Sequence, residues 1–174
     1  VCSSDLANLR LVHAVVKHSQ LQFPIFVQGD APKFSLLQDF RSTPNAVLFA
    51  TSSFWQGVDV AGEALSCVII DKLPFTSPRD PITEARIEMI TDRGDNAFTT
   101  HQIPLAILAL QQGLGRLIRN KRYRGVLVIL DPRLHTQSYG KTFLSPLPPA
   151  PHTSDMAESA QIFALRSQPM IQGR

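Results

Sequence analysis

The sequence contains only two cysteines in 174 residues, with neither a CxxC pair nor a cluster of His and Cys at metal-ligand spacing. We therefore expect no disulfide framework and no metal site. Cys67 lies in an apolar run, which predicts a buried thiol and fits a reducing cytoplasm. No run reaches the roughly 18 to 20 apolar residues that span a bilayer, and the first residues do not resemble a signal peptide.

Two common catalytic motifs are also missing. Without a GxSxG turn, the sequence gives no support for Ser-His-Asp chemistry. Without a GxxxxGK[ST] loop, it has no usual means of holding a triphosphate and its magnesium ion. If the chain acts on ATP, it must therefore supply one half of a site whose other half lies elsewhere.

The composition is that of a folded domain, with 44% hydrophobic and 18% charged residues. The net charge of +3 is too small to indicate nucleic-acid binding by itself. Basic residues are nevertheless concentrated between residues 116 and 124, where no acid occurs. This run has two interpretations: a solvated helix end, since cations favour a helix C-terminus, or a surface that binds anions. The basic residues are Arg116, Arg119, Lys121, Arg122 and Arg124.

Buried strands and helices alternate along the chain. Short apolar runs predict strands at residues 23–27, 46–50, 66–70 and 126–130. Helical spacing or capping signals predict helices at residues 7–18, 33–40, 81–92 and 104–119, with Asp80 capping the third and Gly94 ending it. Strands buried on both faces and joined by helices predict an α/β fold with a parallel sheet.

The two ends differ from the middle. Val1 to Leu6 resembles the translation of a sequencing-adaptor end, so we expect these residues to be non-native and the chain to be a piece of a longer one. We assign residues 7–145 to one domain, truncated at its N-terminus. We assign residues 146–174 to a Pro-rich linker and a short helical tail, with Ser154 as the helix cap. One stripe of that helix either docks on its own domain or meets a partner; it is formed by Met156, Ala160, Phe163 and Ala164.

A polar motif lies near the end of the helix predicted before the last strand. Gln112, Arg116 and Arg119 recur at three- and four-residue spacing, so they share one face. Gly113 and Gly115 each cost about 0.5–1 kcal/mol within a helix, and at residue 115 a glycine lets a target approach the backbone. Two guanidiniums beside a glycine suit a nucleotide phosphate. The alternative is that the arginines are surface or salt-bridge residues.

Two further segments follow predicted strands. Residues 51–59 carry hydroxyls and the Gly57 amide, which can cradle phosphate oxygens, and Asp59 can orient a water, a ribose or an arginine. The alternative for this segment is a capped turn with a packed Trp55. Lys72 is another candidate phosphate contact, although a strand end with a packed Phe75 is the more common arrangement. Because ligands of parallel sheets bind beyond the carboxyl ends of the strands, we expect all of these segments at or near that edge.

In combination, these segments resemble one protein family. Residues 54–62 (FWQGVDVAG), 72–75 (KLPF) and 112–119 (Gln-x-x-Gly-Arg-x-x-Arg) occur in the same order as in the second RecA-like motor domain of superfamily 2 helicases of the DinG/XPD type. The resemblance covers roughly residues 23–164. Within the family, the segment 139–151 favours the bacterial YoaA group.

The resemblance implies a RecA-like fold and one motor half of an ATP-driven 5′-to-3′ DNA helicase, acting in the cytoplasm on single-stranded or forked DNA in repair or replication. In such enzymes ATP and Mg²⁺ lie between two RecA-like domains. The first domain holds the phosphate loop, the magnesium-binding acids and an iron–sulfur cluster, so this chain alone is expected to be inactive. Arg119 would be the arginine finger, with Arg116 as its partner and Gln112 in the same catalytic motif.

The resemblance also implies roles for the segment after residue 50. Thr51 and Ser52 would lie near the DNA backbone, whereas Gly57 and Asp59 would face the nucleotide together with Gly115. Gln56 stands where the family usually has Glu, and its uncharged amide cannot form the ion pair that a carboxylate would make. The tail is a candidate contact for a replication protein. The alternative function is a non-catalytic α/β binding module that uses the arginine cluster as a basic docking patch.

Overall fold

The computed structural model describes residues 2–3, 6–19, 22–54, 65–117 and 125–167. Within these ranges, five strands form one sheet in the order β2-β3-β1-β4-β5, and every neighbouring pair is parallel. The parallel α/β sheet predicted from the sequence is therefore confirmed. The strands are β1 (Cys2–Ser3), β2 (Ile25–Val27), β3 (Val47–Thr51), β4 (Cys67–Ile70) and β5 (Val126–Ile129).

Helices occur at all of the predicted places: the helix predicted at 81–92 agrees at both ends, and the other described ends differ by at most two residues. The predicted end of the helix at 104–119 lies outside the described residues. Two additional short helices, α5 and α6, follow β5. None of the helices within the described ranges is long and apolar enough to cross a membrane. The helices are α1 (Leu6–Lys17), α2 (Lys33–Ser42), η1 (Ser52–Phe54), α3 (Pro81–Asp92), η3 (Phe98–Gln102), α4 (Ile103–Leu117), α5 (Arg133–Thr136), α6 (Gly140–Leu144) and α7 (Met156–Ser167).

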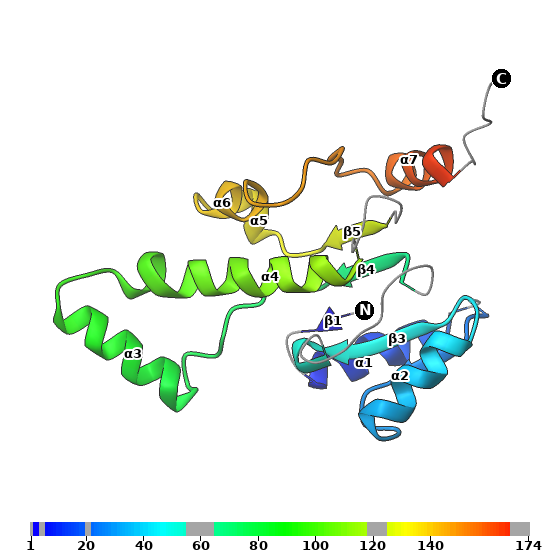
Figure 1. Ribbon diagram of the computed structural model, residues 1–174, viewed down its shortest axis with the longest axis horizontal. Helices are drawn as coiled ribbons and strands as arrows, with labels where there is room; N and C mark the ends of the chain where they lie inside the picture. The colour runs from blue at the N-terminus through cyan, green and yellow to red at the C-terminus, as the bar shows by residue number, and fades with distance from the viewer. Residues whose placement is uncertain (1, 4–5, 20–21, 55–64, 118–124, 168–174) are drawn as a thin grey trace.

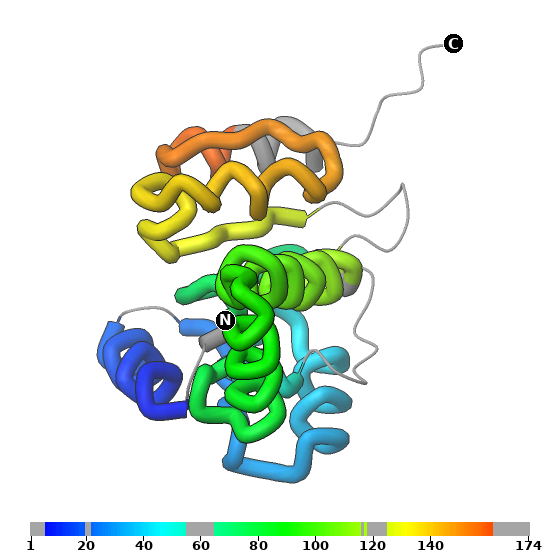
Figure 2. Tube along the Cα trace, turned by 90° about the vertical axis from the view of Figure 1, so that its left-hand side faces the viewer, coloured from blue at the N-terminus to red at the C-terminus, as the bar shows by residue number. Residues whose placement is uncertain are grey.

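The first two long helices pack on opposite faces of the sheet because successive side chains of a strand point in opposite directions. Leu9 of α1 packs with Phe49 on one face. Phe40 of α2 packs with Ala50, the next residue along β3, on the other. Figure 2 shows these two helices on either side of the strands.

The largest core cluster lies under α4. Its buried side chains recur every three or four residues, which is the spacing of one helix face, and they pack against Val68 and Ile70 of β4. Leu134 of α5 and Phe143 of α6 complete this cluster. The buried face of α4 is formed by Ile103, Ala106, Leu110, Leu114 and Leu117.

The path of α4 takes it back across the sheet (Figure 1). The chain leaves β4 at its carboxyl end and enters β5 at its amino end, so the last turn of α4 lies toward the amino-terminal edge. Leu117 packs there so tightly that a Cβ atom on Gly125 would lie 2.4 Å from its Cδ1. The expectation that this part of the chain lies at the carboxyl edge is therefore wrong, because a crossover helix runs antiparallel to its strands.

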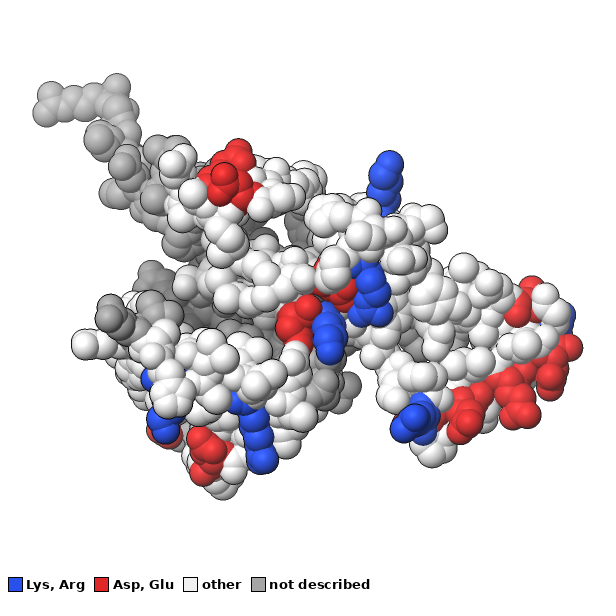
Figure 3. Space-filling view, turned by 180° about the vertical axis from the view of Figure 1, so that it is seen from behind, with Lys and Arg blue, Asp and Glu red and all other residues white. Residues whose placement is uncertain are grey.

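The α3 helix lies apart from the sheet (Figure 1), and Thr83 is its single buried residue. The predicted cap is confirmed: the backbone N–H of Thr83 donates to Asp80 Oδ2 at 3.0 Å. Glu84, Glu88 and Asp92 recur every four residues along this helix, and Figure 3 shows a row of acidic atoms there.

Three local expectations differ from the structure. Cys67 is exposed, because Val68 and Ile70 are the residues of β4 that face α4. The cap of α7 is Asp155 and not Ser154, since Asp155 Oδ1 accepts the backbone N–H of Ala157 at 2.7 Å. Residues 2–3 form a central strand, where no strand was predicted. Whether Val1 to Leu6 is native stays a prediction.

Candidate functional site

The end of α4 presents one exposed face and one buried face. Leu110, Leu114 and Leu117 are at most 6% exposed, whereas Gln112 and Gly115 are exposed to solvent. Gln112 and Gly115, two residues of the spaced polar motif, therefore face away from the core. The Arg116 side chain and the whole of Arg119 lie outside the described residues.

The two glycines of this motif differ in their surroundings. Gly113 is buried, whereas a Cβ atom on Gly115 would meet nothing within 4 Å. Packing within the described part of the chain therefore does not require a glycine at residue 115. A close approach from outside would explain why a helix position carries a residue that costs about 0.5–1 kcal/mol relative to alanine.

At the opposite edge of the sheet, polar side chains meet where β2 and β3 end. Gln28 Oε1 accepts two hydrogen bonds from Thr51, one from its backbone N–H at 2.7 Å and one from its hydroxyl at 2.9 Å. Thr51 Oγ1 also lies 2.8 Å from Ser53 Oγ. Lys33 Nζ donates to the carbonyl oxygen of Ser53 at 3.0 Å, and Ser52 is exposed beside them. We call Gln28, Lys33, Thr51, Ser52 and Ser53 the β2–β3 edge cluster.

The structure therefore does not bring the two predicted parts of the site together. Thr51 and Ser52 lie at the carboxyl edge of the sheet, while Gln112 and Gly115 lie toward the amino edge. Gly57 and Asp59, like Trp55 and Gln56, lie outside the described residues. The described residues on either side of that segment lie at different edges of the sheet: Phe54 follows β3 at the carboxyl edge, and Leu65 precedes β4 at the amino edge.

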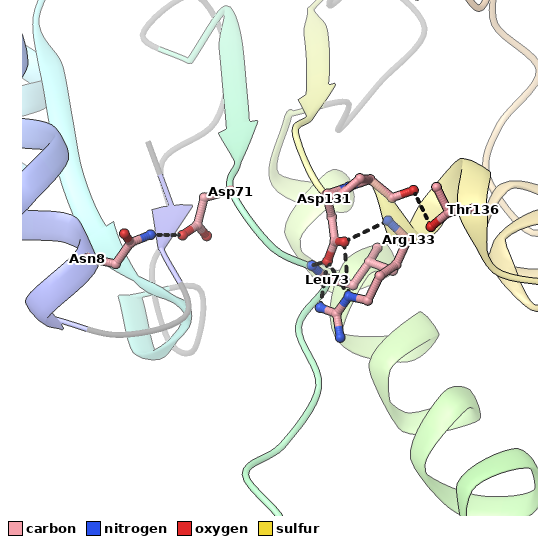
Figure 4. A network of polar contacts seen from close by, with 7 residues as sticks. Asn8, Asp71, Leu73, Asp131, Arg133 and Thr136 are labelled. Atoms are coloured by element: carbon pink, nitrogen blue, oxygen red, sulfur yellow. Dashed lines mark hydrogen bonds and ion pairs between the residues drawn. The ribbon is translucent and has the colours of Figure 1, made fainter.

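A second polar network lies where β4 and β5 end (Figure 4). Asp131 is 3% exposed, and its carboxylate accepts the backbone N–H of Leu73 at 2.8 Å and the Arg133 guanidinium at 2.6 Å. Burial opposes ionisation of this carboxyl, but the hydrogen bonds from Arg133 and Leu73 outweigh it and lower the pKa of Asp131 to about 2. Asp71 directly follows β4, and its Oδ2 accepts a hydrogen bond from Asn8 Nδ2 at 2.6 Å.

The segment after β4 is a packed strand end. Leu73 is 2% exposed, and Phe75 stacks on Phe98 with ring centroids 5.6 Å apart. The Arg133 guanidinium lies 5.2 Å from the centre of the Phe75 ring. The packing interpretation of Phe75 is therefore confirmed, and Lys72 remains exposed at the surface.

No set of three or more His, Cys, Asp or Glu side chains within the described ranges is arranged to hold a metal ion. Described Lys and Arg side chains are spread over the surface that Figure 3 shows. The basic run that begins at Arg116 lies outside the part of the chain whose side chains are described.

Two polar groups at the sheet edge were missed by sequence reasoning. They are Gln28 and Asp131, neither of which was singled out as a site residue. Each directly follows a predicted buried strand, and the carboxyl ends of parallel strands meet at one edge. That rule, applied to every strand rather than to residues 51–59 alone, would have identified both.

A family model described as "Helicase C-terminal domain" matches residues 3–150. The ATP-dependent DNA helicase YoaA of Escherichia coli K12 is 52% identical over 161 residues, which are 89% of this chain and 25% of that protein. The ATP-dependent helicase DinG of Mycobacterium tuberculosis H37Ra is 41% identical over 154 residues, which are 87% of this chain and 23% of that protein.

A solved structure titled XPD helicase is similar in fold, with a TM-score of 0.60 and 20% sequence identity. The match covers 83% of this chain and 26% of that structure. At this level of identity the likeness concerns the fold alone. The chain spans about a quarter of the length of the curated relatives that it matches.

Proposed function

Because this chain belongs to the helicase C-terminal domain family, we propose that it is the second RecA-like motor domain of an ATP-dependent DNA helicase of the DinG/YoaA type. The whole helicase would act on ATP and on single-stranded or forked DNA, and it would move 5′-to-3′ along the DNA. It would work in DNA repair or replication in the cytoplasm. The main partner of this chain would be a first RecA-like domain of the same protein.

The separation of the two candidate surfaces supports two different roles for them. The exposed turn of α4 would face the nucleotide across a cleft between the two motor domains. The β2–β3 edge cluster would face the DNA, with Thr51 and Ser52 near its backbone. Gly57 and Asp59 would lie on the nucleotide side, so the segment between Phe54 and Leu65 would connect the two roles.

The chemistry proposed for the nucleotide side is charge neutralisation. Arg119 would act as the arginine finger on the γ-phosphate, with Arg116 and Gln112 beside it and Gly115 leaving room for the triphosphate. Such fingers contribute about 10³ to 10⁵ in rate in nucleotide hydrolases. The first motor domain would hold most of the ATP contacts and the Mg²⁺ ion, and it would also carry an iron–sulfur cluster.

The observation that carries this proposal is the open space at Gly115. A helix position that is exposed, that carries a glycine and that has no neighbour within 4 Å of a Cβ atom is suited to a partner outside this chain. The exposed side chain of Gln112 lies one turn away on the same helix.

The test is reconstitution of ATP hydrolysis. We expect the isolated chain to hydrolyse no ATP and a mixture with the first motor domain to hydrolyse it in the presence of DNA. Arg119→Ala should abolish turnover in the mixture, by about 10³-fold or more, while ATP binding is largely kept. Arg79→Ala, at an exposed arginine before α3, is the matched control and should leave turnover unchanged. Near-normal turnover of the Arg119 variant would refute the finger assignment.

The alternative function, a binding module, is favoured by one observation on α7. Met156 is 66% exposed and Ala160 is exposed, so the described part of the predicted apolar stripe is not covered by this chain. A replication protein is the partner we propose for this tail within the helicase. If the mixture with the first motor domain hydrolyses no ATP and the chain binds no DNA, the module becomes the better assignment.

A further inference from the structure

The hydrogen bonds of the β2–β3 edge cluster determine where its protons lie. A carboxamide oxygen can only accept, so the Thr51 hydroxyl must donate its single proton to Gln28 Oε1. In the pair between Thr51 and Ser53, the proton must then come from Ser53. Both hydroxyl protons are therefore directed inward, along the path from Ser53 to Thr51 to Gln28.

A DNA phosphate offers only acceptor oxygens, so it needs a donor from the protein. While the Thr51 hydroxyl is bonded to Gln28, it has no proton left for a phosphate, and neither does the Ser53 hydroxyl. The amide of Gln28 is different, because its oxygen is occupied by Thr51 while its Nε2 carries two protons. No hydrogen bond from this Nε2 is made within the described residues, and the side chain is partly exposed.

The orientation of this amide follows from its contacts. The backbone N–H of Thr51 can only donate, so the atom that faces it at 2.7 Å must be the oxygen of Gln28. Two hydrogen bonds hold that oxygen, which fixes the NH₂ group on the opposite side of the amide. The Lys33 ammonium, bonded to the carbonyl of Ser53, adds positive charge to the same cluster.

We infer that Gln28 Nε2 donates to a backbone phosphate of the bound DNA strand, and that Thr51 is the positioning residue that orients this amide. The inference rests on the proposed function, and it moves the direct contact from Thr51 to a residue with no previous assignment. Ser52, exposed beside the cluster, keeps its proposed place near the backbone. A contact of this kind binds DNA without reading its sequence.

The test uses three variants of the 174-residue chain and fluorescence anisotropy of a labelled oligothymidylate at low and moderate salt. In Gln28→Glu, the carboxylate still accepts both hydrogen bonds from Thr51, but the donor is lost and a negative charge faces the phosphates. We expect affinity to fall by about tenfold or more, with an unchanged urea midpoint. Gln38→Glu makes the same charge change at an exposed site on α2 and should bind normally.

The third variant distinguishes the role of Thr51 from that of Gln28. Thr51→Val keeps the backbone N–H bond that orients Gln28, so we expect an affinity loss of less than about threefold. Equal losses for Thr51→Val and Gln28→Glu, or native affinity for Gln28→Glu, would overturn the inference and return the contact to Thr51. If the native chain itself does not bind the oligothymidylate, the DNA side of the proposed function fails as well, which is a distinct result.

Discussion

Replacing Asp131 with asparagine tests whether the network at the end of β5 stabilises the domain. The carboxylate is 3% exposed and joins two separate segments, since it accepts from the Leu73 backbone and from the Arg133 guanidinium. Asparagine has nearly the same volume, and its oxygen can still accept the Leu73 N–H. Its NH₂ group cannot accept from Arg133, so the substitution removes the ion pair and leaves the packing in place.

The expected loss follows from the pKa of Asp131, which is 3.8 for an ordinary aspartate and about 2 in the folded chain. This shift corresponds to about 2 kcal/mol of unfolding free energy at neutral pH. The unfolded chain binds this proton more readily, so the contribution is complete above pH 3.8 and is lost as the pH falls through about 2. Stability therefore rises with pH over this range, as expected for a carboxyl whose charged form is favoured in the folded state.

Urea unfolding of the native chain and Asp131→Asn, followed by circular dichroism from pH 7 downward, measures this contribution. We expect the variant to be less stable by about 2 kcal/mol at pH 7, and the difference to narrow as the pH falls from 4 toward 2. Asp39→Asn, at an exposed carboxylate on α2, is the control and should change stability by less than about 0.5 kcal/mol. A difference that is the same at pH 7 and near pH 2 would show that the ion pair is not its source.

Two glycine substitutions should have opposite effects. Gly140→Ala would place a Cβ atom 1.9 Å from the carbonyl oxygen of Leu134. We therefore expect urea unfolding to show a loss of more than about 2 kcal/mol in the free energy of unfolding, and near-native stability would contradict the close contact. Gly115→Ala should raise stability by up to about 1 kcal/mol, because alanine favours a helix, while slowing ATP hydrolysis in the mixture with the first motor domain. A variant that is both more stable and fully active would show that nothing approaches the helix at residue 115.

Much of the fold was predictable because its signals are local. The strands at residues 46–50 and 126–130 are apolar runs between turn residues, and the cap at Asp80 with Pro81 is a short-range pattern. The buried face of α4 follows from helical spacing alone. Such features depend on residues only a few positions apart, so the sequence determines them without knowledge of the tertiary structure.

The features that were missed depend on where elements lie relative to one another. The end of α4 lies toward the amino edge because a crossover helix reverses direction, although the rule about carboxyl edges was applied to it. The contact between Gln28 and Thr51 depends on the pairing of β2 with β3, which a local sequence pattern does not predict. Cys67 is exposed because the covered face of β4 is the other one. The strand at residues 2–3 was missed because two residues are too few to show the alternation of apolar and polar side chains that indicates a strand.

The position of β1 has a consequence for how this domain assembles. Cys2–Ser3 is the seam of the sheet, since it pairs with β3 on one side and β4 on the other, while β3 and β4 do not pair with each other. The β2–β3 half and the β4–β5 half each carry their own apolar cluster, so each can form from nearby segments before the seam closes. Within the described residues, the halves are joined by the short backbone pairing of β1, by the hydrogen bond from Asn8 Nδ2 to Asp71 Oδ2 and by Leu65, which packs against both apolar clusters. This narrow seam is the natural line along which the domain would open.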